Sequence, residues 1–302
     1  MTTAPDISPF YLAGPTGCGK TGVALELAGL WNAEIVNADA YQIYRGFDIL
    51  SAKPSAEEQA KVPHHLFGAV PLQEDFDVAR YEEVAKACLE QIQSRGRRPI
   101  VVGGSGLYLK SLTHGLTPLP PGDDDLRAEL EQRSLEDLAA ELAERDPEGA
   151  AIVNLKNRRY VTRALEITIL AGRPMSEIKT EWEGKSPEFA GVVLVREREA
   201  LYERINLRTE AMLAAGAVEE VRNLPESISH TAGKAIGVQE IQQFLAGKID
   251  HALCLELIQK NTRRYAKRQM NWFRRETGFR PVELGGDEPP QKTAVRIAAM
   301  FA

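Results

Sequence analysis

The sequence is poor in cysteine and lacks any long hydrophobic run. Its only three cysteines, Cys18, Cys88 and Cys254, lie far apart and form no CxxC pair. This spacing excludes a disulfide framework and a cysteine zinc site, and it is typical of a protein in a reducing cytoplasm. No apolar stretch approaches the roughly 20 residues that cross a bilayer, and the first residues lack the basic and apolar regions of a signal peptide. We therefore expect a cytoplasmic protein with no membrane partner.

Positive charge is also in the minority. The 302 residues contain 37 Lys and Arg against 43 Asp and Glu, which gives a net charge of −6. An acidic balance argues weakly against a nucleic-acid partner, although segregated charge can reverse that conclusion. The composition is otherwise that of a soluble globular protein, and the length suffices for one large core or two domains.

The first strong motif is GPTGCGKT, which satisfies the phosphate-loop pattern G-x-x-x-x-G-K-[ST]. It lies between an apolar run at 10–13, a predicted strand, and a predicted helix at 22–30. Its glycines let backbone N–H groups turn toward an anion, and the helix dipole adds positive potential. Lys20 would reach the outer phosphates and the Thr21 hydroxyl would bind Mg²⁺. The predicted nucleotide- or diphosphate-binding residues are Gly14, Pro15, Thr16, Gly17, Cys18, Gly19, Lys20 and Thr21.

Strands and helices alternate through the first hundred residues. Further strands are expected at 33–37 and 99–102, with a helix at 81–95, a pattern that predicts a parallel sheet covered by helices. The strand at 99–102 runs into Gly-Gly-Ser-Gly, where nucleotide hydrolases and kinases usually place an acid that binds Mg²⁺. Asp39 instead follows the strand at 33–37, at the edge where α/β sheets bind ligands. It could act as a general base, bind an amine, or only cap a turn.

The character of the chain changes at TPLPPGDDD, residues 117–125. Prolines there break the pattern, and helical patterns follow to about residue 144 and again at 156–170. We predict an all-helical insertion domain at 119–187, with an α/β core formed by 1–118 and 188–302. A strand at 192–195 should return to the sheet, helices should follow to about 275, and the residues after 278 show no pattern that we interpret.

Two segments concentrate positive charge. In NRRYVTRALE, residues 157–166, Arg159 and Arg163 share a helix face. In KNTRRYAKRQMNWFRR, residues 260–275, one helical stripe consists of Lys260, Arg264, Lys267, Arg268, Asn271 and Arg275. A single such helix can be a solvated amphipathic face, but two in an acidic chain favour a polyanion such as nucleic acid. The pattern does not choose between DNA and RNA.

His64 and His65 are adjacent and could in principle bind a metal. Adjacent side chains in a strand point to opposite faces, however, so the two imidazoles would not converge on one ion. We therefore favour a structural or substrate-contact role for this pair.

Seven motifs in order resemble those of the tRNA dimethylallyltransferases, also called tRNA isopentenyltransferases. They are GPTGCGKT, NADAYQIYRGFDILSAKP, PHHL, RRPIVVGGSGLYLKSL, RRYVTRALEI, GKAIGVQEI and RRYAKRQMNWFR, and they span about residues 9–276. The resemblance implies a P-loop NTPase-like core with a helical insertion that grips the anticodon stem-loop of tRNA. It also implies Mg²⁺-dependent transfer of a dimethylallyl group from its diphosphate to the exocyclic amine of the adenosine 3′ of the anticodon.

The resemblance assigns roles to individual residues. Asp39 matches the family's catalytic aspartate, which would accept a proton from the adenine amine. Thr21 with Mg²⁺, together with Lys20, would neutralise the departing diphosphate. Arg208, in ERINLRTEAM, matches the essential arginine that stabilises charge on the leaving group, and Arg204 is a less favoured alternative one turn earlier.

The family's RNA contacts also map onto this chain, and we expect a monomer that binds dimethylallyl diphosphate and tRNA. Two departures stand out: Ala40 replaces the usual Ser after the aspartate, and Ser105 replaces a common Thr. The mapped RNA contacts are Asp39, Ala40, Tyr41, Gln42, Ser105, Arg127, Arg159, Tyr160, Val161, Thr162, Arg163, Lys234, Ala235, Ile236, Gly237, Val238 and Gln239.

Three other functions stay open. An adenylate isopentenyltransferase would alkylate free AMP, ADP or ATP, but it would not need the two basic segments. A P-loop nucleotide kinase or NTPase would release or transfer the terminal phosphate of a nucleotide. A nucleotide-gated RNA-binding switch would use the same loop without prenyl chemistry.

Overall fold

The computed structural model describes residues 7–117, 119–183, 188–286 and 288–301. It forms two compact units. Unit 1 consists of Met1–Thr113 and Glu188–Ala302, and unit 2 consists of His114–Pro187. The helical insertion expected at 119–187 falls within unit 2.

Unit 1 is built on a six-stranded sheet in which every neighbouring pair is parallel, in the order β3-β2-β4-β1-β5-β6. The predicted parallel α/β sheet is thereby confirmed, with β3 and β6 as additions that the sequence patterns did not predict. The strands are β1 (Phe10–Ala13), β2 (Ala33–Asn37), β3 (His64–His65), β4 (Arg98–Gly103), β5 (Ala190–Arg196) and β6 (Arg280–Leu284).

Successive residues of each strand point to opposite faces of the sheet, and helices cover both faces, as is usual for a parallel sheet. Leu12, Ile100 and Leu194 pack with α1 (Lys20–Trp31) and α14 (Pro290–Met300) on one face. On the other face, Tyr11, Val36, Val101 and Val193 pack with α3 (Val78–Ser94) and α4 (Gly106–His114). The short helix α2 (Ala56–Lys61) precedes β3.

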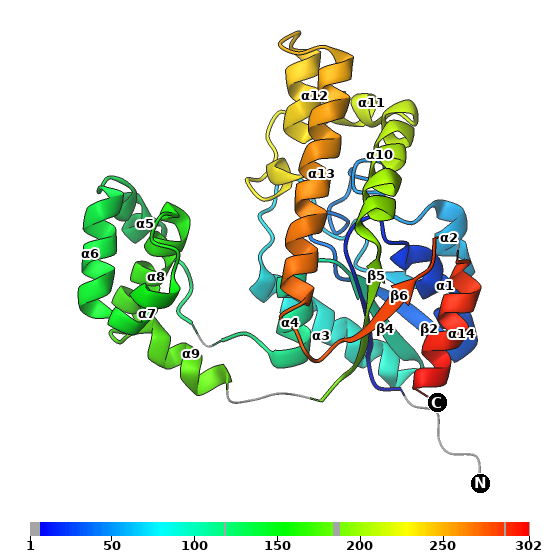
Figure 1. Ribbon diagram of the computed structural model, residues 1–302, viewed down its shortest axis with the longest axis horizontal. Helices are drawn as coiled ribbons and strands as arrows, with labels where there is room; N and C mark the ends of the chain where they lie inside the picture. The colour runs from blue at the N-terminus through cyan, green and yellow to red at the C-terminus, as the bar shows by residue number, and fades with distance from the viewer. Residues whose placement is uncertain (1–6, 118, 184–187, 287, 302) are drawn as a thin grey trace. The chain divides into compact units, whose positions relative to one another are not determined.

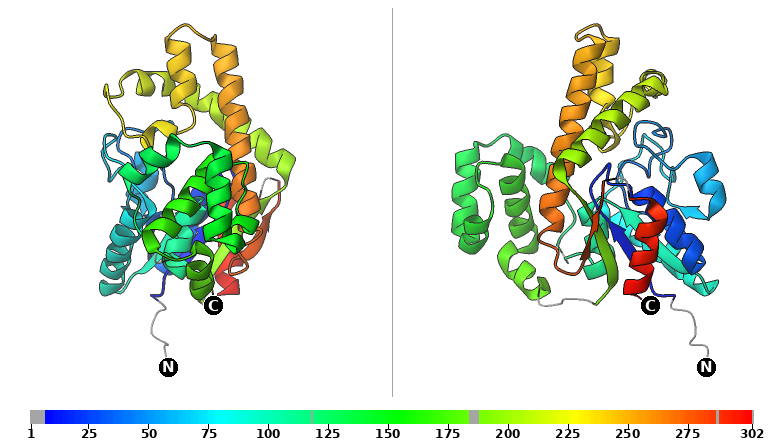
Figure 2. Two further views of the ribbon diagram at one scale, coloured as in Figure 1. Left: turned by 90° about the vertical axis from the view of Figure 1, so that its left-hand side faces the viewer. Right: turned by 45° about the vertical axis from the view of Figure 1, so that its right-hand side comes forward.

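Four helices of unit 1 form an arm that extends from the sheet on the side of the carboxyl end of β5 (Figures 1 and 2). We call this set the helical arm, and within it α10 and α12 both pack against α13. A 3₁₀ turn, Ala232–Lys234, leads into α12. The members of the arm are α10 (Arg198–Ala214), α11 (Ala217–Arg222), α12 (Val238–Leu245) and α13 (His251–Phe273).

Unit 2 is all-helical in its described residues and has its own apolar core. Side-chain caps at Asp123, Ser134 and Asp146 start three of its helices, each by accepting a backbone N–H bond. The helices are α5 (Asp124–Glu131), α6 (Leu135–Arg145), α7 (Pro147–Ile152), α8 (Arg158–Ala171) and α9 (Met175–Glu183). The core includes Leu130, Leu138, Leu142, Leu165 and Ile178. Within the described ranges of both units, no helix has the length and apolar character that a bilayer span needs.

Candidate active site

The phosphate loop connects β1 to α1, as the motif predicts. Gly17 and Gly19 have φ angles of 82° and 103°, a left-handed conformation that strains other residues. A Cβ on Gly17 would also lie 2.9 Å from Cγ1 of Ile205. In the described part of the chain, no side chain caps the first turn of α1, so its N–H groups and the helix dipole are available to an anion.

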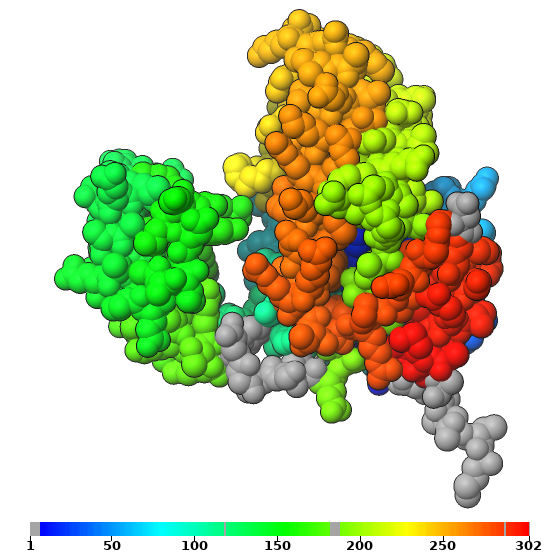
Figure 3. Space-filling model, viewed as in Figure 1, coloured from blue at the N-terminus to red at the C-terminus, as the bar shows by residue number. Residues whose placement is uncertain are grey.

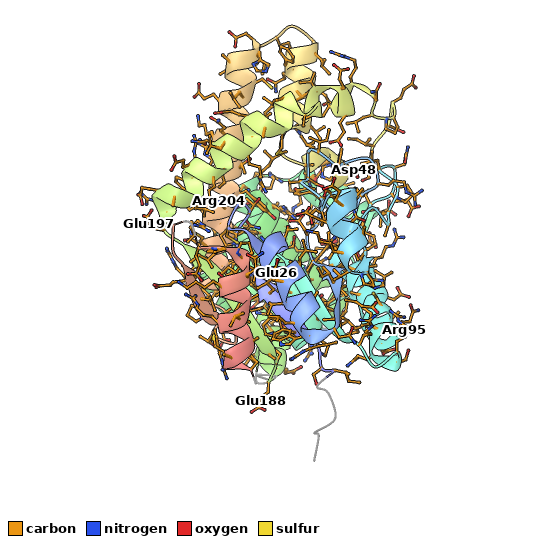
Figure 4. All side chains as sticks on the ribbon, turned by 90° about the vertical axis from the view of Figure 1, so that its right-hand side faces the viewer. Glu26, Asp48, Arg95, Glu188, Glu197 and Arg204 are labelled. Carbon is orange, nitrogen blue, oxygen red and sulfur yellow. The ribbon has the colours of Figure 1, made fainter. Side chains whose placement is uncertain are left out.

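Three cationic side chains surround this loop. The Lys20 ammonium donates to the carbonyl oxygens of Gly14 and Pro15, each at 2.9 Å. Two arginines reach the loop from α10. Arg208 Nη2 donates to Thr16 Oγ1 at 2.6 Å. Arg204, which Figure 4 labels, donates from Nε to Gly17 O at 3.1 Å. The positive charge makes the loop a site for a multiply charged anion.

Arg208 differs from a surface arginine because its guanidinium is buried. Burial lowers the pKa of its guanidinium, an effect that the Asp39 carboxylate opposes. Its Nε is buried and has no hydrogen-bond partner among the described residues. Because a buried N–H without an acceptor is costly, this group is suited to bind an anionic ligand.

Asp39 sits in a tight turn directly after β2. Its Oδ1 accepts from the backbone N–H of Tyr41 at 2.9 Å, and its own N–H donates to Asn37 Oδ1 at 2.9 Å. Asn37 in turn donates from Nδ2 to Leu66 O at 3.1 Å, which ties the turn to the residue after β3. Asp39 can therefore cap the turn and also act in a reaction. The turn orients its carboxylate, which lines a cavity of the site.

The glycine-rich segment after β4 supports that turn. Ser105 Oγ accepts from the backbone N–H of Ala40 at 2.9 Å. The Ser105 hydroxyl thus holds Ala40, the residue that follows Asp39. Burial, and secondarily the Asp39 carboxylate, raise the pKa values of Tyr41 and Tyr265, so both phenols stay protonated.

Gln269, on α13, is a site residue that the sequence patterns did not reveal. Its Oε1 accepts from the backbone N–H of Thr16 at 2.8 Å, and its Nε2 donates to Gly104 O at 2.9 Å. The side chain is only 5% exposed, so one amide joins the phosphate loop to the segment after β4. The available signal was a polar residue on the buried face of a helix whose outer face is basic.

The phosphate loop, Asp39 and Arg208 line two neighbouring cavities. The larger, of about 370 Å³, contains both the cationic loop and Asp39, with an apolar floor. The smaller, of about 60 Å³, shares Thr16, Asp39, Ser51 and Arg208 with it. The apolar floor of the larger cavity includes Ala24, Ile35, Phe67 and Val102. The smaller cavity is lined further by Tyr41, Leu50, Met212, Ile236, Ile258 and Tyr265. The larger cavity suits a diphosphate with a short hydrocarbon chain, and Asp39 lines both this cavity and the smaller one.

The residues present also fit a magnesium ion that shares the site with a diphosphate. The described residues contain no group of three or more His, Cys, Asp or Glu that could hold a metal alone. Mg²⁺ commonly takes one or two protein oxygens together with substrate phosphates and water. The hydroxyl of Thr21, which lines the larger cavity, can be such a ligand.

The two histidines of β3 have separate surroundings, as their adjacency predicts. His65 Nε2 lies 2.6 Å from Glu34 Oε2, which also binds Arg95 Nη2 at 2.7 Å. His64 Nδ1 lies 2.8 Å from Val62 O, and its ring lines the larger cavity. His65 therefore joins a structural ion-pair network, whereas His64 can contact a ligand.

The mapped RNA contacts divide into exposed and buried residues. Lys234 and Gln239 are exposed in unit 1, as are Arg159 and Tyr160 in unit 2. Within the contiguous ranges some side chains point inward, because successive residues of a helix face different sides. The side chains of Val161, Ala235 and Val238 pack into apolar cores, and those of Pro15 and Cys18 in the phosphate loop are buried too.

Two further mapped arginines of unit 2 are held by one acid. Arg127 Nε and Arg163 Nη1 bind the fully buried carboxylate of Glu166 at 2.9 and 2.6 Å. Both guanidinium groups remain partly exposed, so they can still meet a phosphate. Glu166 fixes their positions.

The basic stripe of α13 is exposed, as predicted. Its residues from Lys260 to Asn271 lie on the outer face of the helix, while Thr262, Ala266 and Gln269 face inward. Arg275 follows the end of the helix at Phe273. Figure 3 shows α13 (orange) along the surface of unit 1. The exposed residues are Lys260, Arg264, Lys267, Arg268, Asn271 and Arg275.

Relatives of known name resemble nearly the whole chain. A tRNA dimethylallyltransferase of Akkermansia muciniphila is 44% identical over 287 residues, which are 95% of this chain and 97% of that protein. The tRNA dimethylallyltransferase of Geobacter sulfurreducens is 43% identical over 90% of both chains.

Solved structures agree with these relatives. The tRNA isopentenylpyrophosphate transferase of Bacillus halodurans superposes with a TM-score of 0.70 at 33% identity, over 97% of this chain and 96% of that one. A eukaryotic dimethylallyltransferase acting on tRNA gives a TM-score of 0.84 at 27% identity, over 98% of this chain and 79% of that one. The model of the family named IPP transferase matches residues 42–276, a range that includes Ser105, Arg208 and Gln269. By sequence and fold, this chain belongs to the IPP transferase family.

Proposed function

We propose that this protein transfers a dimethylallyl group from dimethylallyl diphosphate to the exocyclic N6 amine of the adenosine 3′ of the anticodon in tRNA. One observation carries the proposal. A cationic phosphate loop and the Asp39 carboxylate line one cavity with an apolar floor, while the strand end at Gly103–Gly106 carries no acid. Such a site can hold a diphosphate as a leaving group without activating water.

The donor is held at its charged end. Lys20, Arg208 and the N–H groups at the start of α1 bind the diphosphate oxygens, and Arg208 gains the acceptor that its Nε lacks among the described residues. When bound to Thr21, Mg²⁺ supplies further positive charge to the same oxygens. The five-carbon chain lies on the apolar floor, with its first carbon toward Asp39.

The acceptor amine then replaces the diphosphate. A bond forms between N6 and the first carbon of the donor, the bond from that carbon to oxygen breaks, and the diphosphate leaves with the electron pair. Asp39 takes the proton that N6 loses. An aromatic amine is a weak nucleophile, so the orientation of the base is as important as the basicity of Asp39. Tyr41 and Tyr265 line the smaller cavity and give the base aromatic neighbours on which to stack.

The acceptor is placed in tRNA rather than in a free nucleotide because of the basic stripe. A free nucleotide does not need an exposed row of cations along α13, whereas an RNA backbone does. The target base must leave the anticodon stack to reach Asp39, and a loop nucleotide costs less to flip than a paired one. A monomer in a reducing cytoplasm is part of the same proposal.

Parallel incubations test the reaction. Enzyme, Mg²⁺ and dimethylallyl diphosphate are mixed with unmodified tRNA or with AMP, and the nucleosides are analysed by mass spectrometry. We expect N6-dimethylallyladenosine only in the tRNA reaction. Transfer only to AMP would show an adenylate isopentenyltransferase, and steady phosphate release from ATP would show a kinase or NTPase.

The Asp39→Ala variant separates catalysis from RNA binding. It should lose transfer while keeping its affinity for tRNA, because the basic stripe is intact. Full activity in this variant would exclude Asp39 as the base. An RNA-binding switch predicts no transfer by the wild-type protein.

A further inference from the structure

We propose that Glu220, on α11, is a positioning residue for this reaction, because its carboxylate fixes the wall that the two cavities share. Nothing in the sequence motifs singled out this residue. Its Oε1 accepts from the backbone N–H groups of Asp48 at 2.7 Å and Ile49 at 2.8 Å, and its Oε2 accepts from that of Leu50 at 2.8 Å. Figure 4 labels Asp48, at one end of this contact. The proposal rests on the proposed prenyl transfer.

The segment that Glu220 holds lines both cavities. We call residues 48–52 the wall loop. Ser51 and Ala52 line the larger cavity, and Leu50 and Ser51 line the smaller one. Displacement of this loop would therefore alter the space for the donor and for the acceptor at once.

The opposite end of the wall loop is tied to the turn of Asp39. Gln42 Nε2 donates to Ser51 O at 3.0 Å and to Ala52 O at 2.9 Å, and its backbone N–H lies 3.4 Å from Asp39 Oδ1. Ala52 has a φ of 52°, a strained conformation that persists only where surrounding contacts enforce it. Glu220 and Gln42 thus clamp the loop from two sides.

A carboxylate suits this anchor better than a neutral group. Three backbone N–H groups converge on it, and hydrogen bonds to a charged acceptor are about twice as strong as neutral ones. Loss of the carboxylate leaves three donors without their protein acceptor, so the loop loses the contact that fixes it on this side. Glu220 also comes from the helical arm that carries Arg208, and it therefore links the arm to the cavity wall.

The test compares Glu220→Ala and Glu220→Gln with Glu219→Ala. Glu219 is the matched control, because it is exposed on the same helix and its carboxylate pairs with Arg222. For Glu220→Ala we expect kcat/KM for dimethylallyl diphosphate to fall roughly 10–100-fold, the effect of a misplaced reactant. We expect tRNA affinity to change less than about twofold, since the variant leaves the basic stripe of α13 and the arginines of unit 2 in place.

The Gln variant grades the effect. An amide oxygen can keep the bonds to Asp48 and Ile49 while its NH₂ group opposes the N–H of Leu50, so we expect an intermediate loss. Glu219→Ala should match the wild type. Wild-type kinetic constants in folded Glu220→Ala, with only a lower melting temperature, would overturn the proposal.

Two arrangements keep the result interpretable. If Glu220→Ala does not fold, the Gln variant decides, and a wild-type kcat/KM in that variant contradicts the proposal. Calorimetry with dimethylallyl diphosphate, in the absence of tRNA, measures whether the wall loop is in place. The affinity for this donor should fall in Glu220→Ala and stay at the wild-type value in Glu219→Ala. If the wild-type protein binds the donor but transfers nothing, the proposed function is refuted, and the effect of Glu220 on donor binding can still be tested. If Glu220→Ala and Glu219→Ala bind the donor equally well, the role of Glu220 is refuted.

Discussion

Buried charges serve different ends in the two units. In unit 1, Arg208 lines a cavity, and its Nε lacks an acceptor in the described part of the chain. In unit 2, the carboxylate of Glu166 is fully buried and receives Arg127, Arg163 and the backbone N–H of Asp123. Arg208 keeps polar capacity for a ligand, whereas the carboxylate of Glu166 is saturated within the fold.

This difference separates sites of chemistry from sites of architecture. Buried polar groups in native proteins are nearly always hydrogen-bonded, and the exceptions deserve a functional explanation. Substitution of an unsatisfied group in unit 1 should therefore affect the reaction more than stability. Substitution of a saturated group in unit 2 should do the reverse.

The strongest test on the side of unit 1 is Arg208→Ala. Loss of one charge contact to the leaving group should raise the barrier by about 3 kcal/mol, a rate loss of ~10²-fold or more. The free energy of unfolding should change little, because the buried guanidinium of Arg208 loses its hydration and recovers only part of that cost through hydrogen bonds within the protein. Single-turnover rates and denaturant unfolding measure the two quantities. Arg198→Ala, at the exposed start of α10, is the control and should behave as wild type; an unchanged rate in Arg208→Ala contradicts the assigned role.

The corresponding test in unit 2 is Glu166→Ala. Removal of one partner of a buried ion pair can cost 3–5 kcal/mol, but both arginines here are partly exposed, so we expect about 2 kcal/mol. Denaturant unfolding should show the loss, while the single-turnover rate at saturating tRNA stays near wild type. Glu177→Ala, an exposed acid on α9, is the control. A large loss of rate with unchanged stability would erase the distinction between the units.

Asp146 makes the stability of unit 2 depend on pH, which gives a further test of the comparison between the units. Burial alone would raise the pKa of this carboxyl, but the Ser176 hydroxyl and the backbone N–H groups of Gly149 and Ser176 outweigh it, so the pKa lies below its ordinary value. The stabilisation is therefore present above the unfolded pKa and is lost as the pH falls through the folded one. Asp146→Asn should cost about 1 kcal/mol at neutral pH.

Thermal unfolding at several pH values checks this prediction. The gap in stability between wild type and Asp146→Asn should narrow in acid, below the ordinary carboxyl range. A gap that stays constant from neutral to acid pH would show that the charge of Asp146 is not what stabilises unit 2.

The smallest expected effect concerns the basic stripe. Arg264→Ala and Arg268→Ala should each lower the salt dependence of tRNA binding, by about 0.7–0.9 in the slope of log K against log salt for each phosphate that the protein no longer neutralises. Binding titrations at several salt concentrations measure the slope. Arg222→Ala, on α11, is the control. A wild-type slope near zero would mean that α13 is not the RNA surface.

The sequence predicts best those features that are local or strongly patterned. The phosphate loop, the parallel strands and the helical insertion depend on short motifs and apolar periodicity. Strand β3 has only two residues and β6 follows a segment without a clear pattern, so neither was predicted. Val161 was mapped as part of a continuous range, whereas its place on the helix turns it inward.

The rest of the site depends on distant contacts. The bonds from Glu220 to residues 48–50 cross about 170 positions of the chain, between segments that share no motif. A close reading of α13 as two-faced would have raised Gln269 as a candidate, but not its partners. Sequence patterns indicate which residues are available, and the fold decides which of them meet.

The bridge made by Gln269 has a consequence for synthesis on the ribosome. The amide that holds Thr16 is encoded 253 positions later. A growing chain therefore exposes its glycine-rich loop long before the side chain that steadies it has been translated. We expect a product that stops short of α13 to lack a competent donor site, so premature termination should leave no fragment that sequesters the donor.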